Sequence, residues 1–399
     1  MAFSEVTNQS YFSRIGSAFK GIIFGGLLFL IAFPLQFWNE GRAVRRIKTL
    51  AEGRGAVIGD VSVDSIDSSN DGKLVHMIGL ATAEGTLTDQ KFAVSVDNAL
   101  KLQRSVEMYQ WHEDVETKTR KKTGGGKTTE KTYSYYKDWS SQAIDSSSFH
   151  SRSKSEVGNG NPPMPYRSDI QTAKRIDLGA YHLNDSLASM INNYEDLNVE
   201  DRLESLPEEI RSVANTHNGG FYVGENPGEP RIGDLRINFS VVHPTSVSII
   251  SEQTGETFRP YTAKSVSGSI ERLEVGNHGV AEMFKHMEDE NTAMTWLLRL
   301  AGLALMTVGI GLILNPLVVL ADVIPFLGGI VGAGTWFIAF LLGAFFSFAT
   351  ISIAWVFYRP AWGIALAIIA AIFGYLVYSR TKKATKVNLQ TDDGIPVVG

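Results

Sequence analysis

Two parts of the chain are apolar over lengths that fit a lipid bilayer. One lies near the N-terminus, at residues 21–38, and the other begins at Trp296 and ends at Ser379. About 20 apolar residues are enough for an α-helix to cross the hydrocarbon core. The pattern therefore predicts four transmembrane helices, at residues 21–38, 296–320, 326–358 and 361–379.

The uncharged run 323–358 is too long for one span and barely long enough for two. Its first part is rich in glycine, which lowers helix propensity. We interpret it as a glycine-rich segment followed by a span from Trp336 to Tyr358, and the sequence leaves open whether residues 323–335 are re-entrant. Asp322, just before this run, is predicted to be a solvated loop acid.

Between the apolar parts, apolar and polar residues alternate with the period of two that is typical of strands. Residues 101–118 and 128–141 flank the triglycine Gly124–Gly126, so they predict a long β-hairpin. Residues 146–169 are rich in Ser, Gly, Asn and Pro and predict a loop. Strand patterns return at Gly220, which predicts a second β-rich lobe after the loop.

The predicted fold class is therefore an α+β membrane protein, with one N-terminal and three C-terminal transmembrane helices and a large β-rich domain inserted between the first and the second. The predicted segments are an N-terminal tail (1–20), transmembrane helix 1 (21–38), β-rich lobe 1 (39–145), a loop (146–169), β-rich lobe 2 with short helices (170–277), a juxtamembrane helix (278–295), transmembrane helix 2 (296–320), the glycine-rich segment with transmembrane helix 3 (326–358), transmembrane helix 4 (361–379) and a C-terminal tail (380–399).

Composition excludes several kinds of chemistry. The net charge of −5 gives no basic surface for nucleic acid. The absence of cysteine excludes disulfides, thiol catalysis and cysteine-ligated zinc. The tripeptide Gly126-Lys127-Thr128 is not a phosphate-binding loop, because Lys121 stands where that motif requires its first glycine. We expect no cofactor and no metal.

Five short segments, spread in order over the chain, carry a resemblance to a known family. They are Asn39-Glu40-Gly41-Arg42-Ala43, Glu107-Met108-Tyr109-Gln110-Trp111, Gly233-Asp234-Leu235-Arg236, Thr295-Trp296 leading into Arg299, and Phe357-Tyr358-Arg359-Pro360. In these segments the sequence resembles the transmembrane protein 43 family, also called LUMA. The triglycine, the missing cysteines and the extended tail from Lys386 to Gly399 look like departures from the family pattern.

The resemblance implies an orientation that the charges leave open, since the basic clusters Arg42–Lys48 and Arg380–Lys383 favour opposite orientations. It implies cytoplasmic termini and an extracytosolic middle domain. The implied location is the endoplasmic reticulum and nuclear inner membrane in a eukaryote, or the inner membrane, with a periplasmic domain, in a bacterium. The resemblance implies no catalytic residue for this chain.

Four charged residues are predicted to meet at one membrane face. Glu40 and Arg42 follow the first span, Arg299 lies at the entrance of the second, and Arg359 lies between the last two. Because the guanidinium group suits phosphate and carboxylate, they form a candidate lipid-headgroup site. The alternative is a set of separate arginines that reach the interface, with one structural ion pair at Glu40.

Two further groups of residues are weaker candidates. Tyr109, Trp111 and Trp139 form a candidate surface for a partner or ligand, although cross-strand aromatic pairs commonly only stabilise a hairpin. The spacing of His278, Glu282 and His286 places them on one helix face, where adjacent members could hold a metal ion, yet it lacks the arrangement of a zinc-protease motif. The alternative is that they are polar residues on the exposed face of the juxtamembrane helix.

These observations favour a non-enzymatic protein that organises or scaffolds a membrane through homo-oligomers and other membrane proteins. Membrane lipids are expected partners, and nucleic acid is not. The alternative is a lipid-headgroup-binding protein or a membrane-embedded enzyme with its site at the extracytosolic membrane face, so enzymatic activity is left open. A transporter fits less well, because the sequence has no inverted repeat.

Overall fold

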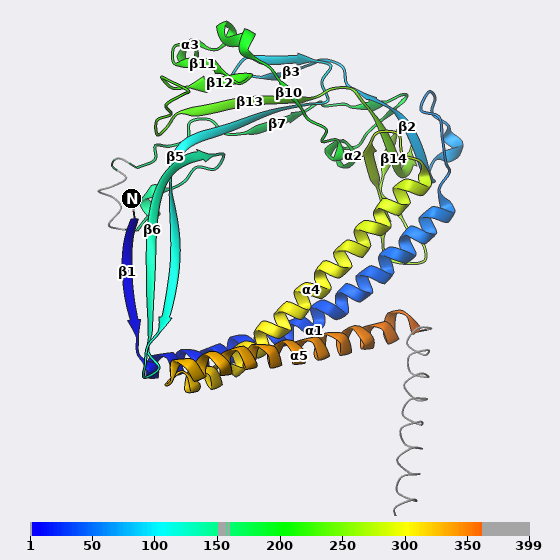
Figure 1. Ribbon diagram of the computed structural model, residues 1–399. Helices are drawn as coiled ribbons and strands as arrows, with labels where there is room; N and C mark the ends of the chain where they lie inside the picture. Colours follow the sequence, from blue (N-terminus) through cyan, green and yellow to red (C-terminus); the bar gives the residue numbers. More distant parts are fainter. Residues whose placement is uncertain (1, 151–157, 159, 361–399) are drawn as a thin grey trace, which may run out of the picture. The chain divides into compact units, whose positions relative to one another are not determined.

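The computed structural model describes residues 2–150, 158 and 160–360, and it forms two compact units (Figure 1). The β unit comprises residues 1–10, 48–122 and 126–289. The helical unit comprises residues 11–47, 123–125 and 290–399. The predicted fourth span, 361–379, and the tail 380–399 lie outside the described residues.

Among the described residues, three helices are long and apolar enough to cross a membrane, one near the N-terminus and two near the C-terminus, which confirms the α+β membrane class. They are α1 (Tyr11–Ala56), α4 (Val280–Ala321) and α5 (Pro325–Tyr358). Helix α5 runs without a break through the glycine-rich segment. Pro325 begins it, at a position where the missing N–H costs no hydrogen bond.

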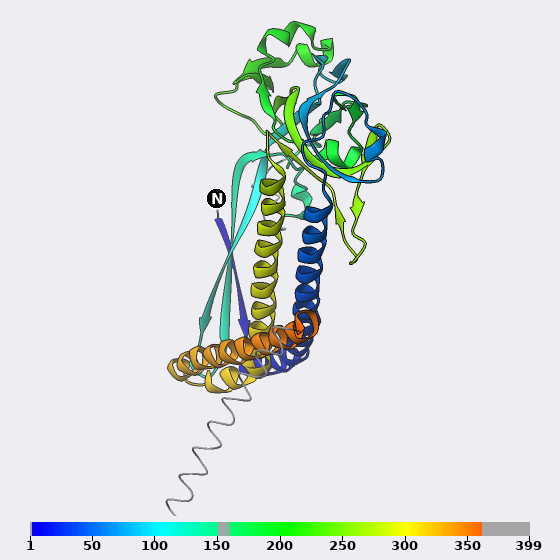
Figure 2. The same ribbon diagram turned by 90° about the vertical axis from the view of Figure 1, so that its right-hand side faces the viewer.

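Two glycines bring helices α1 and α4 close together within the helical unit (Figure 2). A Cβ atom added at Gly25 would lie 2.8 Å from the Cβ of Leu312, and one added at Gly309 would lie 2.9 Å from the backbone nitrogen of Phe29. Small residues allow such close backbone approach, which stabilises membrane helices through van der Waals packing.

The β unit contains two large antiparallel sheets and two small ones. The first sheet has the order β1 (Ala2–Gln9), β6 (Lys127–Ser140), β5 (Lys101–Lys121), β13 (Leu235–Val242), β12 (Gly220–Val223) and β11 (Ala214–His217), with β10 (Glu195–Leu197) on β13 and β7 (Asp169–Thr172) on β5. The second has the order β15 (Thr257–Arg259), β14 (Thr245–Thr254), β2 (Leu74–Thr82), β8 (Asp177–Leu178) and β9 (Tyr181–His182), with β18 (Arg272–Val275) on β14. The small sheets pair β3 (Thr86–Asp89) with β4 (Val94–Asp97) and β16 (Tyr261–Thr262) with β17 (Ser269–Ile270).

The two lobes expected in sequence order are not separate in the structure. Strand β5 pairs with β13, and β2 pairs with β14, so each large sheet joins strands from before and after the predicted loop. Each of these strands pairs with a strand far away in the sequence. The alternation of apolar and polar residues within one strand shows which face is buried but does not specify the partner strand. Short helices α2 (Asp185–Met190) and α3 (Glu208–Arg211) lie between the strands in the chain.

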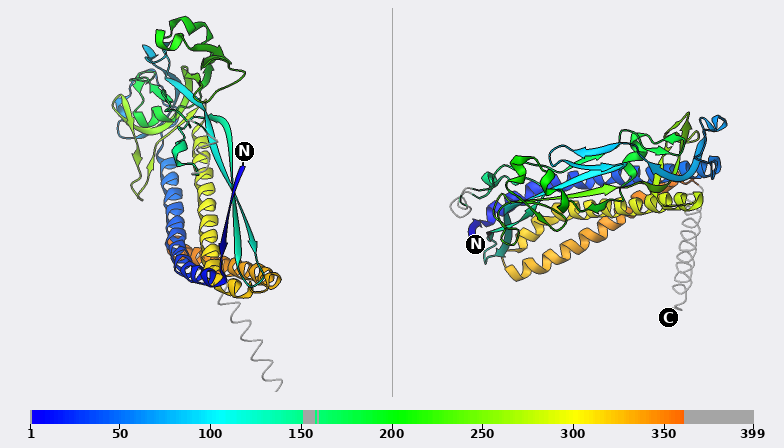
Figure 3. Two further views of the ribbon diagram at one scale, coloured as in Figure 1. Left: turned by 90° about the vertical axis from the view of Figure 1, so that its left-hand side faces the viewer. Right: turned by 90° about the horizontal axis from the view of Figure 1, so that it is seen from above.

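The predicted hairpin is confirmed, with Tyr109 opposite Trp139 and Lys121 opposite Lys127. It gains a third strand that the sequence analysis missed. Strand β1 runs antiparallel to β6 from Ala2, opposite Ser134, to Gln9, opposite Lys127 (Figure 3). The segment predicted to be an N-terminal tail is therefore a strand followed by the first turns of α1.

The last turns of α1 and the first turns of α4 belong to the β unit. There Leu50 and Phe284 are fully buried in one cluster with Ile270. This apolar cluster packs the last turns of α1 and the first turns of α4 against the β unit's own core.

Candidate functional site

Glu40 lies at the centre of a polar cluster in the helical unit. Its carboxylate is fully buried and accepts hydrogen bonds from Arg299 Nε at 2.6 Å and Arg299 Nη2 at 2.9 Å. Trp355 Nε1 donates a third, at 2.9 Å, so helices α1, α4 and α5 all contribute. A two-pronged pair of this kind fixes the orientation of the guanidinium group.

Two tryptophans, Trp296 and Trp355, make cation–π contacts with Arg299 and Arg359. The Arg299 guanidinium carbon lies 4.8 Å from the centre of the Trp296 ring and 5.8 Å from that of Trp355. The Arg359 guanidinium lies 5.5 Å from the Trp355 ring. Cation–π contacts of this length attract the charge without neutralising it. Among the described residues, the structure pairs Arg359 with no carboxylate.

Arg42 is held by neutral groups instead. It donates to the Asn291 side-chain oxygen at 3.0 Å, to Thr295 Oγ1 at 3.0 Å and to the Asn39 side-chain oxygen at 3.2 Å. Asn39 in turn donates to the backbone oxygen of Thr295 at 3.0 Å. These bonds tie α1 to α4 one turn beyond the Glu40 pair.

A pocket of about 260 Å³ opens beside this cluster. All three helices contribute to its lining, which combines apolar residues of α1 with polar, aromatic and charged residues of α4, of α5 and of the position just after α5: Ala43, Ile47, Asn291, Thr292, Thr295, Trp296, Arg299, Trp355 and Arg359. Two guanidinium groups therefore face one small concavity at the end of the apolar helices.

Of the four predicted residues, Arg299 and Arg359 line the pocket, whereas Glu40 and Arg42 do not. Glu40 holds Arg299 and Trp355 from behind the pocket, and Arg42 bonds to Asn291 and Thr295 of its wall. The sequence analysis missed the role of Trp355 and Asn291. A polar or amphipathic residue near the end of an apolar run is the signal that could have identified them.

The aromatic candidates are packed rather than free. Tyr109 and Trp139 are paired at 5.2 Å between ring centres, and the Arg236 guanidinium covers Trp139 at 4.0 Å. Lys137 lies 4.8 Å from the Trp111 ring. Contacts of this kind stabilise a hairpin, and the role of these three residues as a surface for a partner or ligand stays a prediction.

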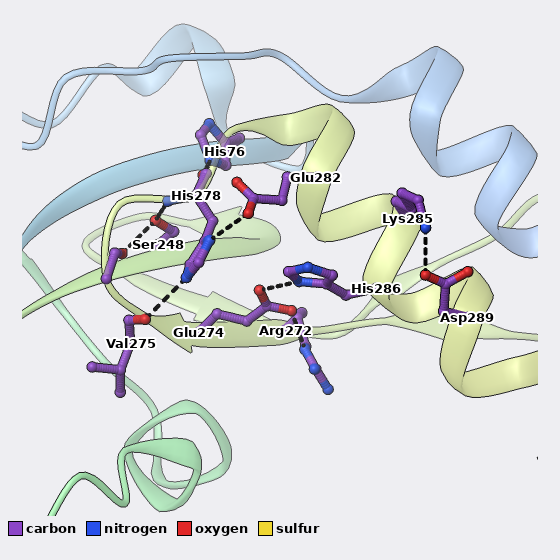
Figure 4. A network of polar contacts seen from close by, with 11 residues as sticks. His76, Ser248, Arg272, Glu274, Val275, His278, Glu282, Lys285, His286 and Asp289 are labelled. Atoms are coloured by element: carbon purple, nitrogen blue, oxygen red, sulfur yellow. Dashed lines mark hydrogen bonds and ion pairs between the residues drawn. The ribbon is translucent and has the colours of Figure 1, made fainter. Parts of the chain in front are cut away.

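The histidines at the start of α4 form ion pairs (Figure 4). His278 Nδ1 lies 3.2 Å from Glu282, and His286 Nδ1 lies 2.8 Å from Glu274, which also accepts from Arg272 at 2.9 Å. The hydrogen bond with Glu282 raises the pKa of His278 above its ordinary value. No group of three suitable ligands for a metal ion occurs in the part of the chain that the structure describes.

A second buried ion pair lies elsewhere in the helical unit. Asp322 is fully buried and pairs with Arg14, so the predicted solvated loop acid is wrong. Arg14 also donates to the backbone oxygen of Gly125, and the Gly124 N–H donates to the backbone oxygen of Val323 at 3.1 Å. The hairpin tip is thereby fixed to the start of α1 and to the corner between α4 and α5.

Comparisons with known proteins agree with the resemblance in the sequence. The family model described as Transmembrane protein 43 matches residues 108–360. Transmembrane protein 43 of Rattus norvegicus is 32% identical over an alignment of 387 residues that covers 94% of this chain and 93% of the relative. That of Homo sapiens is 31% identical over 392 residues, 95% of this chain and 94% of the relative.

A more distant relative extends the family to insects. The Transmembrane protein 43 homolog of Drosophila melanogaster is 28% identical over 370 residues, 90% of this chain and 94% of the relative. No solved structure matches the chain. Because the family model covers more than half of the chain and the relatives cover nearly all of it, the chain belongs to the transmembrane protein 43 family and is an integral membrane protein.

Proposed function

We propose that this protein organises its membrane by holding the headgroup of an anionic phospholipid at the pocket beside Glu40. The observation that carries the proposal is the excess of positive charge there. Arg299 is matched by Glu40, whereas the guanidinium of Arg359 faces the same pocket beside a neutral tryptophan. A phosphate accepts the two-pronged hydrogen bonds that arginine offers.

The position of the pocket along the helices supports this proposal. Glu40 follows the apolar run 21–38 by two residues, and Arg359 directly follows the last residue of α5. Trp296 and Trp355 belong to the residue type that is enriched at the boundary between hydrocarbon and headgroups. In this proposal Glu40 is a positioning residue that fixes Arg299, and Arg359 binds the phosphate.

Scaffolding through homo-oligomers and other membrane proteins is the wider part of the proposal. Helix α5 exposes large apolar side chains along its length, which either lipid or a neighbouring chain must cover: Phe326, Ile330, Phe337, Phe345, Phe348 and Phe357. A bound lipid beside such a surface would join neighbouring copies. Endoplasmic reticulum and nuclear envelope, or a bacterial inner membrane, remains the location that the resemblance predicts.

Native mass spectrometry in lipid nanodiscs tests the proposal. We expect one anionic phospholipid to be retained per chain in nanodiscs of phosphatidylcholine with phosphatidylserine. Arg359→Ala should lose it, and the control Lys20→Ala, which changes an exposed lysine of α1, should keep it. Variable bulk lipid on the unmodified protein, or retention by Arg359→Ala, would overturn the headgroup site. The same spectra report whether the protein is an oligomer.

A further inference from the structure

His278 lies in the short loop 276–279 between β18 and α4, and the second sheet holds its backbone at two points. Its N–H donates to Ser248 Oγ of β14 at 2.7 Å, and its carbonyl oxygen lies 2.9 Å from Nε2 of His76 on β2 (Figure 4). A carbonyl oxygen can only accept, so Nε2 of the fully buried His76 is the donor of this bond. The backbone of residue 278 is therefore bonded to two neighbouring strands of the β unit.

The ring of His278 has an oxygen acceptor beside each of its nitrogens. Nδ1 lies 3.2 Å from Oε1 of Glu282, and Nε2 lies 3.1 Å from the backbone oxygen of Val275. A neutral imidazole has one N–H, so it can donate to only one of these oxygens and presents a lone pair to the other. The imidazolium form donates to both. The geometry of the ring therefore favours protonated His278, in agreement with its raised pKa, of which the bond with Glu282 is the largest cause.

The charged groups around this loop come from several segments of the β unit. They are Asp60 and His76 before and on β2, Arg272 and Glu274 on β18, and Glu282, Lys285, His286 and Asp289 on α4. Glu274 pairs with Arg272 at 2.9 Å and with His286 at 2.8 Å, and Lys285 pairs with Asp289. Among the described residues, Glu282 pairs with His278 alone. Its charge therefore gains a partner only when His278 is protonated.

We propose that residues 276–279 act as a proton-controlled clasp between the second sheet and the first turn of α4. While His278 is protonated, its ring holds α4 through Glu282 and the end of β18 through Val275. When His278 loses the proton, one of these two contacts is lost, and the loop and the first turn of α4 open locally more often. The pH around the β unit then regulates the order of this segment. The proposal concerns the β unit alone and does not depend on the headgroup site.

The direction of the pH effect follows from the contacts of the ring. The pKa of His278 in the closed clasp lies above the value of about 6.5 that a solvent-exposed histidine has. The clasp is therefore most stable below about pH 6.5, and it loosens as pH rises through the higher pKa of the closed state. The ratio of closed to open clasp should fall by about tenfold for each unit that separates the two pKa values.

Hydrogen exchange of the full chain in lipid nanodiscs, read by mass spectrometry, tests the clasp. The His278 N–H, bonded to Ser248, and the Met283 N–H, which donates to the Gly279 oxygen at 3.1 Å, report its opening. After correction for the intrinsic exchange rate at each pH, their protection should decrease above about pH 6.5. It should also be lower than that of the paired strands β5 and β13 at every pH, because the opening is local. Protection that is independent of pH, or equal to that of β5 and β13 throughout, would overturn the proposal.

Two matched variants of α4 identify the carboxylate that is responsible. Glu282→Gln keeps a side chain that can accept a hydrogen bond but removes its charge, and most of the pH dependence at His278 and Met283 should disappear. Asp289→Asn removes a carboxylate from the same helix at the exposed pair with Lys285, and it should retain the native pH dependence. Native pH dependence in Glu282→Gln, or its loss in Asp289→Asn, would show that the pair of His278 and Glu282 does not control the loop.

Discussion

Arg299 donates two hydrogen bonds to Glu40, at 2.6 and 2.9 Å, and the carboxylate has no exposed surface. A buried pair contributes little to stability by itself, because both charges lose their hydration. Removal of one partner is nevertheless strongly destabilising, because the other charge is then left buried without a partner. The pair therefore holds Arg299 in a single orientation, and a fixed guanidinium group is what selective binding of an anion requires.

Removing only the carboxylate should destabilise the helical unit. Glu40→Ala leaves Arg299 buried without its partner, which costs about 3–5 kcal/mol in comparable pairs. Thermal and denaturant unfolding in detergent micelles would measure the loss. The control is Lys285→Ala at the exposed pair with Asp289, whose side chains are 68% and 62% exposed and should contribute less than about 1 kcal/mol. Equal losses in both variants would contradict the buried role of Glu40.

Long local patterns were sufficient to predict much of this fold. The first three membrane helices follow from uncharged length alone, and the hairpin follows from alternation around a triglycine. The pairing of Glu40 with Arg299 agrees with the expectation that successive spans return the chain to one membrane face, and Trp355 contacts both Glu40 and Arg359. None of these predictions requires knowledge of a distant partner.

The remaining features depend on partners far away in the sequence. Asp322 is buried because Arg14, 308 residues earlier, reaches it. Strand β1 has eight residues, and its pairing with β6, more than 100 residues later in the chain, makes it a strand. Asn291 and Trp355 join the polar cluster through the rotation of each helix about its axis. For Trp355, the pattern of an all-apolar helix does not specify this rotation.

Two adjacent glycines of α1 should respond in opposite ways to the same substitution. Gly25→Ala places a Cβ atom 2.8 Å from Leu312 Cβ, so the helices must separate, and overpacking of this kind costs about 1–3 kcal/mol. Gly26→Ala meets no atom within 4 Å and should be neutral or stabilising. Unfolding temperatures of the two variants in one detergent provide the comparison. Equal effects would show that α1 and α4 do not pack through Gly25.

The histidine at the start of α4 should make stability depend on pH. The hydrogen bond with Glu282 raises the pKa of His278 above the unfolded value of about 6.5. The protonated form is favoured by folding, so its contribution is complete below that value and disappears as pH rises through the higher folded pKa. The unfolding temperature should therefore fall more as pH rises above about 6.5 in the native protein than in His278→Gln. If the unfolding temperature depends on pH in the same way in both proteins, the pair of His278 and Glu282 is not the cause of the pH dependence.

The contact between Arg14 and the hairpin tip should protect the tip from proteolysis. Arg14 donates to the Gly125 carbonyl while paired with Asp322, and a hydrogen bond to a charged group contributes about 1.5–3 kcal/mol. Arg14→Ala should therefore increase the open population, and with it the rate of tryptic cleavage at Lys121 and Lys122, on the order of tenfold or more.

Two comparison variants show whether this protection comes from the ion pair itself. Lys20→Ala removes an exposed cation from the same helix and should leave the cleavage rate unchanged. Exchange of the charges, as Arg14→Asp with Asp322→Arg, should restore part of the pairing although it removes the bond to Gly125. Protection should then lie between that of the native protein and that of Arg14→Ala. Full protection in Arg14→Ala would mean that the tip is held by the Gly124–Val323 bond and the strand pairing of β1, without help from the buried arginine.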